Sequence, residues 1–240
     1  MTHGVSRQVK SGADSANTSS IFDRLRELYV TACPAGYEVG ESVDAFYSGE
    51  EFWEKFRGWL ENSPDFYPAS DKAFVESAIA IDRARVINIG IFYPWAEIEW
   101  GARAKAWVGL DNNPAVLARA QEVLRHYPDR RVRLVEANIT APLDLGERFD
   151  WVLDLSTLDQ LDPRAYRTIL ENYKRLSDRL VMAYDTTDNA LATYDFEQCG
   201  FNALMNPETM VEMLEELGYR VLDHRPFAHK PYRSYVSAML

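Results

Sequence analysis

The sequence has little cysteine, little positive charge and no long apolar run. Its 240 residues include only two cysteines, Cys33 and Cys199, and two thiols make neither a disulfide framework nor a cysteine metal cluster. No stretch reaches the roughly 18 continuous apolar residues of a membrane-spanning helix, and the N-terminus has no apolar signal core. We therefore expect a reduced, soluble, cytoplasmic protein without a membrane partner.

Basic residues are outnumbered by acidic ones. Lys and Arg total 26 against 37 Asp and Glu, which gives a formal net charge of −11 at pH 7. Nucleic-acid-binding surfaces are basic, so we expect no nucleic-acid partner. The hydrophobic fraction of 47% is enough for one large domain, or for one domain with a cap. The composition leaves the oligomeric state open.

Three regions differ in composition. Residues 1–19 are small and polar and predict a disordered tail. Residues 20–82 combine helical apolar spacing with many aromatic side chains and predict a helical cap or lid. The aromatic side chains have two interpretations, because they either line a pocket for an apolar substrate or form ordinary core. For the first interpretation the candidate substrate-binding residues are Tyr29, Tyr47 and Trp53.

Residues 83–240 show a different rhythm, in which short apolar strands alternate with helices. Strands are predicted over residues 85–90, 106–111, 131–138, 148–155, 179–185, 219–225 and 234–240. Helices are predicted after Asn113-Pro114, Asp162-Pro163 and Asn206-Pro207, where a capping side chain precedes a proline at the first helical position. This alternation predicts an α/β fold, with a doubly wound, mostly parallel, seven-stranded sheet that helices cover on both faces.

Polar residues follow the strands at their carboxyl ends, where doubly wound sheets bind ligands. Gly90 lets the backbone of the first loop approach a ligand, although one glycine also marks an ordinary turn. Asp111 ends the second strand and suits the hydroxyls of a ribose; its alternative is to cap the next helix, a role that Asn113 already fills. Asn138 and Ile139 suit an adenine edge and ring face, unless the Asn138 amide binds its own backbone.

The order and spacing of these features resemble the class I S-adenosylmethionine-dependent methyltransferases over residues 85–185. The family motif D-x-G-x-G-x-G is matched by Asn88, Gly90, Phe92 and Pro94, so only the first glycine is retained. The phrase V-L-D-L-S-T-L-D-Q-L is similar to the family's V-L-S-L-G-V-L-H-H-L. The resemblance implies a Rossmann-like methyltransferase fold, with strand order 3-2-1-4-5-7-6 and an antiparallel seventh strand.

The resemblance also implies a cofactor and a reaction. S-adenosylmethionine is the expected cofactor, and the expected reaction is O- or N-methylation of a small, partly apolar molecule by direct displacement. Aromatic faces attract cations, so Tyr93 is a candidate for the sulfonium, unless the loop aromatics only seal the cap against the sheet. The candidate cofactor-binding residues are Asn88, Gly90, Tyr93, Asp111, Asn112, Asn138, Ile139 and Asp154.

The candidate catalytic residues are Asp159, Tyr184 and Asp185, which follow the fourth and fifth strands. Asp159 lies where many relatives have a histidine and suits the orientation or deprotonation of an acceptor, unless it is a solvated loop acid. The segment D-T-T-D-N at 185–189 does not reproduce the Asp-Asn pair of metal-dependent relatives, so no metal site is predicted. Because two motif glycines are missing, a non-catalytic or repurposed methyltransferase-like protein is the alternative function.

Overall fold

The structure is a computed structural model of the chain. The residues that it describes are 20–32, 49–50, 53–55, 57–58, 68–186, 206–227 and 230–240. The predicted tail at 1–19, Tyr47 and the side chain of Tyr29 lie outside these residues.

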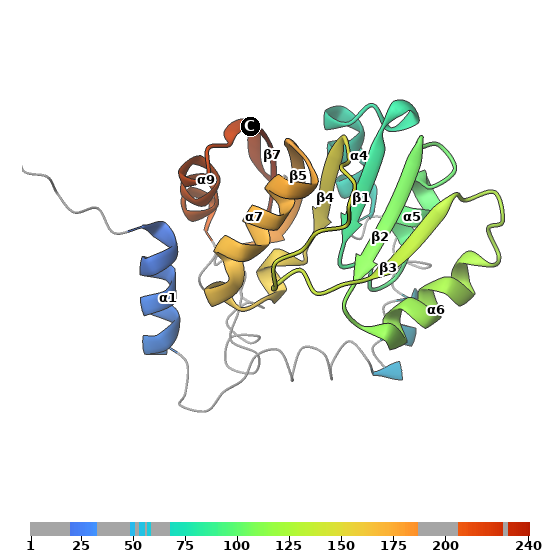
Figure 1. The fold of residues 1–240 in the computed structure, drawn as a ribbon, viewed down its shortest axis with the longest axis horizontal. Coiled ribbons are helices and arrows are strands. Elements are labelled where there is room, and N and C mark those ends of the chain that lie inside the picture. The colour runs from blue at the N-terminus through green and yellow to red at the C-terminus, as the bar shows by residue number, and fades with distance from the viewer. Residues whose placement is uncertain are drawn as a thin grey trace, which may run out of the picture.

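Seven strands form one sheet in the order β3-β2-β1-β4-β5-β7-β6, as Figure 1 shows from β3 to β7. The pairs among β1 to β5 are parallel, whereas β7 runs antiparallel to both β5 and β6. The predicted order and the antiparallel seventh strand are confirmed. The strands are β1 (Arg85–Ile89), β2 (Ala106–Asp111), β3 (Val132–Glu136), β4 (Trp151–Leu155), β5 (Arg179–Asp185), β6 (Arg220–Phe227) and β7 (Lys230–Met239).

Helices cover both faces of the sheet, and Figure 1 shows α7 and α4 on opposite faces. The α-helices are α1 (Ile21–Ala32), α4 (Pro68–Ala78), α5 (Trp95–Trp100), α6 (Pro114–Leu124), α7 (Tyr166–Leu176) and α9 (Pro207–Glu216). Three short 3-10 turns accompany them: η1 (Ile81–Arg83), η2 (Leu158–Gln160) and η3 (Pro163–Ala165). None of the helices in the described ranges has the length and hydropathy needed to cross a membrane.

Two of the three helix starts predicted after a capping residue and a proline are confirmed, those at Asn113 and Asn206. Asn113 Oδ1 accepts hydrogen bonds from the N–H groups of residues 115 and 116, at 3.0 and 3.3 Å. Asn206 Oδ1 caps α9 in the same way, at 2.7 Å from the N–H of residue 209. Asp162 caps the 3-10 turn η3 instead, and the α-helical geometry of α7 begins only at Tyr166.

Alternation along β5 divides the core between the two faces of the sheet. Leu180, Met182 and Tyr184 belong to the core cluster that includes apolar side chains of α1, α7 and α9. Val181 and Ala183 belong to the cluster on the other face, which α4 and α5 cover. Because both faces of β5 are fully buried, the strand is a continuous apolar run, as expected for a parallel sheet.

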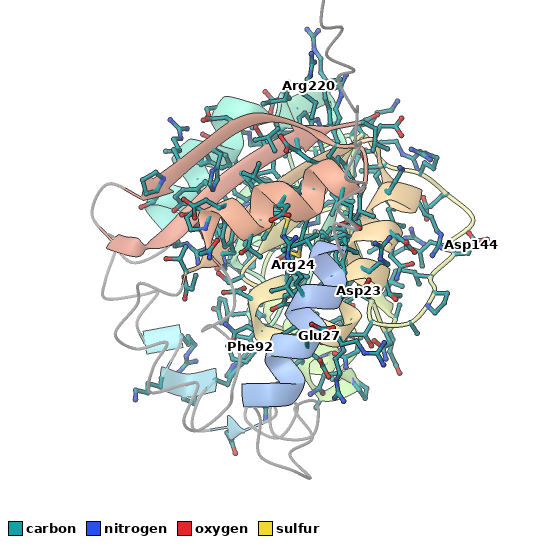
Figure 2. All side chains as sticks on the ribbon, turned by 90° about the vertical axis from the view of Figure 1, so that its left-hand side faces the viewer. Asp23, Arg24, Glu27, Phe92, Asp144 and Arg220 are labelled. Carbon is teal, nitrogen blue, oxygen red and sulfur yellow. The ribbon has the colours of Figure 1, made fainter. Side chains whose placement is uncertain are left out.

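The two α-helices at the start of the described chain pack on different faces. The N–H of Ile21 and the hydroxyl of Ser20 both donate to the Glu216 carboxylate, at 2.8 and 2.7 Å. These bonds tie α1 to α9, and Figures 1 and 2 show the two helices side by side. In contrast, α4 joins the other face, where the Phe74 ring lies 4.8 Å from the ring of Tyr235 on β7.

Candidate functional site

The loop after β1 fits tightly against the turn after β4. Gly90 has φ +68°, and a Cβ atom at this position would lie 2.1 Å from Thr157 Oγ1. The Gly90 N–H donates to Leu110 O at 2.7 Å, and Thr157 Oγ1 donates to Ile89 O at 2.7 Å. The residue therefore has to be glycine for two reasons, its left-handed backbone and its close neighbour.

Phe92 stands at a glycine position of the family motif, and its backbone has the left-handed conformation that favours glycine. Its φ is +27°, which is rare for a bulky residue and costs about 1–2 kcal/mol. The Phe92 N–H lies 3.4 Å from Asp111 Oδ2, to which it donates. The loop thus retains a glycine-like conformation at this position although the glycine itself is absent.

Asp111 joins this loop to the end of β2. Besides the Phe92 N–H, its carboxylate accepts the N–H of Asn113 through Oδ1 at 2.9 Å. The side chain is half-buried and the neighbouring Asn112 is exposed. Asn113, and not Asp111, caps α6. A carboxylate held rigidly at a strand end and still partly open to solvent can accept hydrogen bonds from a ligand.

Asn88 has a partner that the sequence did not suggest. Its Nδ2 donates to Glu97 Oε1 at 2.8 Å, and the same oxygen accepts from Trp107 Nε1 at 3.1 Å. Glu97 is fully buried; burial raises the pKa of its carboxyl group, and the negative charge of Asp111 raises it further. The sequence contains one signal for the burial of Glu97, which is its place among the buried residues of its helix, next to Ala96 and three residues before Trp100.

The candidate adenine-binding residues after β3 are used locally. Asn138 is exposed, and its Oδ1 accepts from the N–H and the hydroxyl of Thr140, at 2.9 and 2.7 Å. Ile139 is only 5% exposed and belongs to the core cluster, while its carbonyl accepts from Asn172 Nδ2 at 2.8 Å. The observed Asn138 contact is the backbone bond that the sequence left as the alternative.

Aromatic side chains of the loop contact the cap. The Trp53 ring lies 5.4 Å from that of Phe92 and 5.1 Å from that of Tyr93, and the Arg119 guanidinium lies 5.7 Å from the Trp53 ring. Figure 2 labels Phe92 beside the short helical pieces of residues 53–58. Trp95 packs elsewhere, 5.4 Å from Trp100. The candidate substrate-binding Trp53 therefore covers the loop that begins at Gly90.

Asp154 organises the turn after β4. It is fully buried; Oδ1 accepts the N–H of Thr157 at 2.7 Å, and Oδ2 accepts the Tyr173 hydroxyl at 2.7 Å and the N–H of Leu158 at 3.2 Å. Burial raises the pKa of this carboxyl group to about 6, against the opposing effect of these donors. The described contacts of Asp154 hold the turn that presses Thr157 against Gly90.

The structure brings Asp159 and Asp185 together. Asp159 is fully buried in η2, and its Oδ2 accepts the Asp185 N–H at 2.9 Å. Burial raises the pKa of the Asp159 carboxyl group to about 8, and the nearby Asp185 charge adds to the shift. Asp159 Oδ1 and Thr186 Oγ1 are both buried without a hydrogen-bond partner in the described part of the chain. Asp159 is therefore a buried carboxyl group with a raised pKa and not a solvated loop carboxylate.

Asp185 also belongs to a buried ion cluster. Its Oδ1 lies 3.2 Å from Arg233 Nη1, and Arg233 forms a two-pronged pair with Asp71 of α4, with Nη2 to Oδ2 at 2.8 Å. Ser156, at φ +72°, accepts a further bond from Arg233. Tyr184 takes no part in these ion pairs. Its ring belongs to the core cluster, and its hydroxyl lies 2.8 Å from Nε2 of the half-buried His224.

The raised acid pKa values predict how stability depends on pH. A group whose folded pKa is raised binds its proton more tightly when folded, so its stabilisation is lost as pH rises through the folded pKa. For Asp159 this window runs from its ordinary 3.8 to about 8. We expect Asp159→Asn to flatten the fall in unfolding free energy between about pH 5 and 8, measured by urea denaturation.

The control for this experiment is Asp144→Asn on an outer loop. Figure 2 shows Asp144 far from Phe92, and this variant should keep the pH dependence of the original chain. An Asp159→Asn protein with the same pH slope as the original would contradict a raised pKa of Asp159.

Two further observations concern ligands. Within the described residues no group of three His, Cys, Asp or Glu side chains could hold a metal ion; residues 188 and 189 lie outside them. A cavity of about 430 Å³ is lined by Pro142, Leu143, Asp144 and Arg175. It lies by the loop that precedes β4 and shares no residue with the carboxyl-end site.

Fold and site together define a class of protein. The chain is a doubly wound α/β protein whose β1 loop, β2 carboxylate and β4 turn meet at the carboxyl ends of the strands. No family model and no curated protein sequence matches it. Solved structures do match it, and those compared below are methyltransferases.

Three of these structures illustrate the likeness. The N-methyltransferase NodS of Bradyrhizobium japonicum, in complex with S-adenosylhomocysteine, is 16% identical over 83% of this chain and 96% of its own, with a TM-score of 0.61. Magnesium protoporphyrin IX methyltransferase of Synechocystis, with bound S-adenosylmethionine, is 13% identical over 86% and 99%, at 0.64. The glycopeptide N-methyltransferase MtfA, with sinefungin, is 16% identical over 73% and 95%, at 0.57. The chain thus has the Rossmann-like methyltransferase fold, as its sequence predicted.

Proposed function

We propose that the protein is an S-adenosylmethionine-dependent methyltransferase. The observation that carries the proposal is the link between the two cofactor-binding elements. The left-handed Phe92 donates its N–H to Asp111, so the loop and the carboxylate are held together where a nucleoside would bind. The match to structures that contain S-adenosylmethionine or its analogues supports this assignment.

The residues present fit the cofactor. Asp111 would accept the two ribose hydroxyls, since its carboxylate is fixed and half-exposed. Tyr93, Trp53 and the acidic strand ends suit a cation, because aromatic faces and carboxylates both attract positive charge. When bound, S-adenosylmethionine supplies an electrophilic methyl group on sulfur. The remaining candidate contacts are Asn88, Gly90, Asn112, Asn138, Ile139 and Asp154.

Asp159 and Asp185 are our candidates for handling the acceptor, because they lie together at the carboxyl ends of β4 and β5. A raised pKa makes the deprotonated Asp159 a stronger base, which suits it to take a proton from a hydroxyl or an ammonium group. The Tyr184 hydroxyl, bonded to His224, is the third candidate. The substrate would be a small, partly apolar molecule that contacts Trp53; Tyr29 and Tyr47 stay candidates from the sequence alone.

Two classes of acceptor atom are compatible with this proposal. NodS and MtfA are N-methyltransferases, whereas the Synechocystis protein is a magnesium protoporphyrin IX methyltransferase. We therefore keep both O- and N-methylation in the proposal. The proposed setting is cytoplasmic, with no nucleic-acid or membrane partner.

The second candidate function is a methyltransferase-like protein without catalysis. The packing of Trp53 on Phe92 and Tyr93 favours it, because bulky side chains occupy the neighbourhood of the loop. A measurement of cofactor binding distinguishes the two functions, since only the enzyme must bind the cofactor.

We expect Asp111→Ala to weaken S-adenosylhomocysteine binding by about 10- to 100-fold, because two charge-assisted hydrogen bonds are lost. Isothermal titration calorimetry measures the dissociation constant. Glu122→Ala is the matched control, an exposed acid on α6, and should bind as the original chain does. Absence of binding to the original chain at millimolar ligand would favour the non-catalytic function, and unchanged affinity in Asp111→Ala would remove the ribose role.

A further inference from the structure

Glu97 lies in a place built for a carboxyl group. It is fully buried in α5, and its Oε1 accepts one hydrogen bond from a β1 side chain and one from a β2 side chain. A Cβ atom at Gly109 on β2 would lie 3.1 Å from this oxygen, so glycine there leaves room for the carboxyl. The Glu97 carboxyl group is thus held by two donors, Asn88 and Trp107, and has the space that Gly109 leaves.

Two atoms of this group have no partner in the described part of the chain. They are Glu97 Oε2 and Asn88 Oδ1, both fully shielded from solvent. A buried acceptor without a hydrogen bond is costly. The two residues are already joined through Nδ2 and Oε1, at 2.8 Å. One proton on Oε2 would let that oxygen donate to Oδ1, and both atoms would then be satisfied in a closed acid–amide pair.

We propose that Glu97 is a neutral carboxylic acid that pairs with Asn88, and that this pair positions the cofactor loop in place of the acid that the family motif has at residue 88. The second half of this statement rests on the proposed function. Glu97 is a positioning residue, since it is buried beneath the loop and acts through Asn88 and the strand that leads to Gly90.

The pairing explains why residue 88 is an amide. An aspartate there would face Glu97 Oε1 with an acceptor where Nδ2 now donates, and it would add a second carboxyl to the buried space. The charged groups around Glu97 agree with a neutral acid. Burial raises its pKa most and the charge of Asp111 raises it too, whereas the donors Asn88, Trp107 and the Glu97 N–H oppose these effects. None of these influences comes from a cation.

The test compares Glu97→Gln, Glu97→Ala, Asn88→Asp and the double variant Asn88→Asp/Glu97→Gln. Glutamine keeps the shape and can donate to Asn88 Oδ1, so Glu97→Gln should unfold like the original chain at neutral pH. Glu97→Ala and Asn88→Asp should each lower the unfolding midpoint and weaken S-adenosylhomocysteine binding by about tenfold or more. The double variant restores an acid–amide pair in reverse and should recover most of the loss caused by Asn88→Asp.

Two readouts respond to the proton itself. The infrared spectrum of the original chain at neutral pH should contain the carbonyl band of a protonated acid. This band should be weaker in the spectrum of Glu97→Gln, because Glu97 no longer contributes to it. The unfolding free energy of the original chain should also fall as pH rises above the ordinary value of 4.5 for this group, and Glu97→Gln should show a flatter slope. Glu99→Gln on the same helix is the control and should change neither.

Three outcomes would overturn the pair. They are an unchanged protonated-acid band in Glu97→Gln, a loss in Glu97→Gln as large as in Glu97→Ala, and an Asn88→Asp protein as stable as the original. The infrared and unfolding measurements need no ligand. If the original chain binds no S-adenosylhomocysteine, the proposed function fails while these measurements still decide the pair.

Discussion

Gly90→Ala should destabilise the protein by about 2–5 kcal/mol, because it combines backbone strain with overpacking. The new Cβ would lie 2.1 Å from Thr157 Oγ1 and 2.7 Å from Thr157 Cγ2, at a residue with φ +68°. Either the loop or the β4 turn must move, so cofactor affinity should fall together with stability. Urea denaturation measures the first effect and calorimetry the second.

Gly146→Ala is a matched control, because Gly146 has almost the same φ, +67°, but a Cβ atom there would have nothing within 4 Å. It should show the backbone strain alone, about 1–2 kcal/mol. The double variant Gly90→Ala/Thr157→Ala removes the two nearest obstructing atoms, Thr157 Oγ1 and Cγ2, and leaves only Cβ, at 2.9 Å. Its loss should therefore be smaller than the sum of the two single losses. Equal losses in Gly90→Ala and Gly146→Ala would show that the contact with Thr157 is unimportant.

Arg233→Met should cost about 3–5 kcal/mol, since it leaves buried carboxylates without their cation. The side chains of Arg233 and Asp71 are each only 2% exposed, and that of Asp185 is 12% exposed. The Tyr235 hydroxyl, which donates to Asp71 at 2.8 Å, cannot replace a full positive charge. Thermal and urea unfolding measure the loss.

The control is Arg103→Met, which removes an exposed cation paired with Glu76 and Asp82. Exposed pairs contribute little, so this change should cost less than about 1 kcal/mol. If Arg233→Met does not fold, Arg233→Lys keeps the charge without the two-pronged geometry and should give a smaller, measurable loss. Similar losses for Arg233→Met and Arg103→Met would contradict the importance of burial.

The sheet and the helix starts could be predicted because their signals are local. A capping side chain followed by proline marks the α-helix starts at Asn113 and Asn206 and the start of a 3-10 turn at Asp162. Strand ends were less accurate. The strand predicted from residue 148 begins at Trp151, and the last strand, predicted from 234, begins at Lys230. Its first residues are polar and include a proline, and they are strand only because they pair with β5 and β6.

The contacts of the site could be predicted only in part. The position of Asp111 at a strand end could be predicted because a strand end followed by a separate capping residue is a local pattern, and its ribose role stays a prediction. The ion pair of Asp71 with Arg233 joins residues 162 positions apart, and no periodicity in the sequence links them. Likewise, the need for glycine at Gly90 depends on Thr157, which lies on another strand's turn. The motif comparison could not show that Phe92 would keep a left-handed backbone.

The final strand of the chain has a consequence for synthesis in the cell. β7 occupies an interior position, between β5 and β6, although it is the last of the seven strands along the sequence. A ribosome must therefore translate past residue 239 before β5 can receive its neighbour. Products that stop before β7 would carry the bare edge of an apolar strand, a template for aggregation, so an intact β7 should decide the soluble yield of any recombinant form.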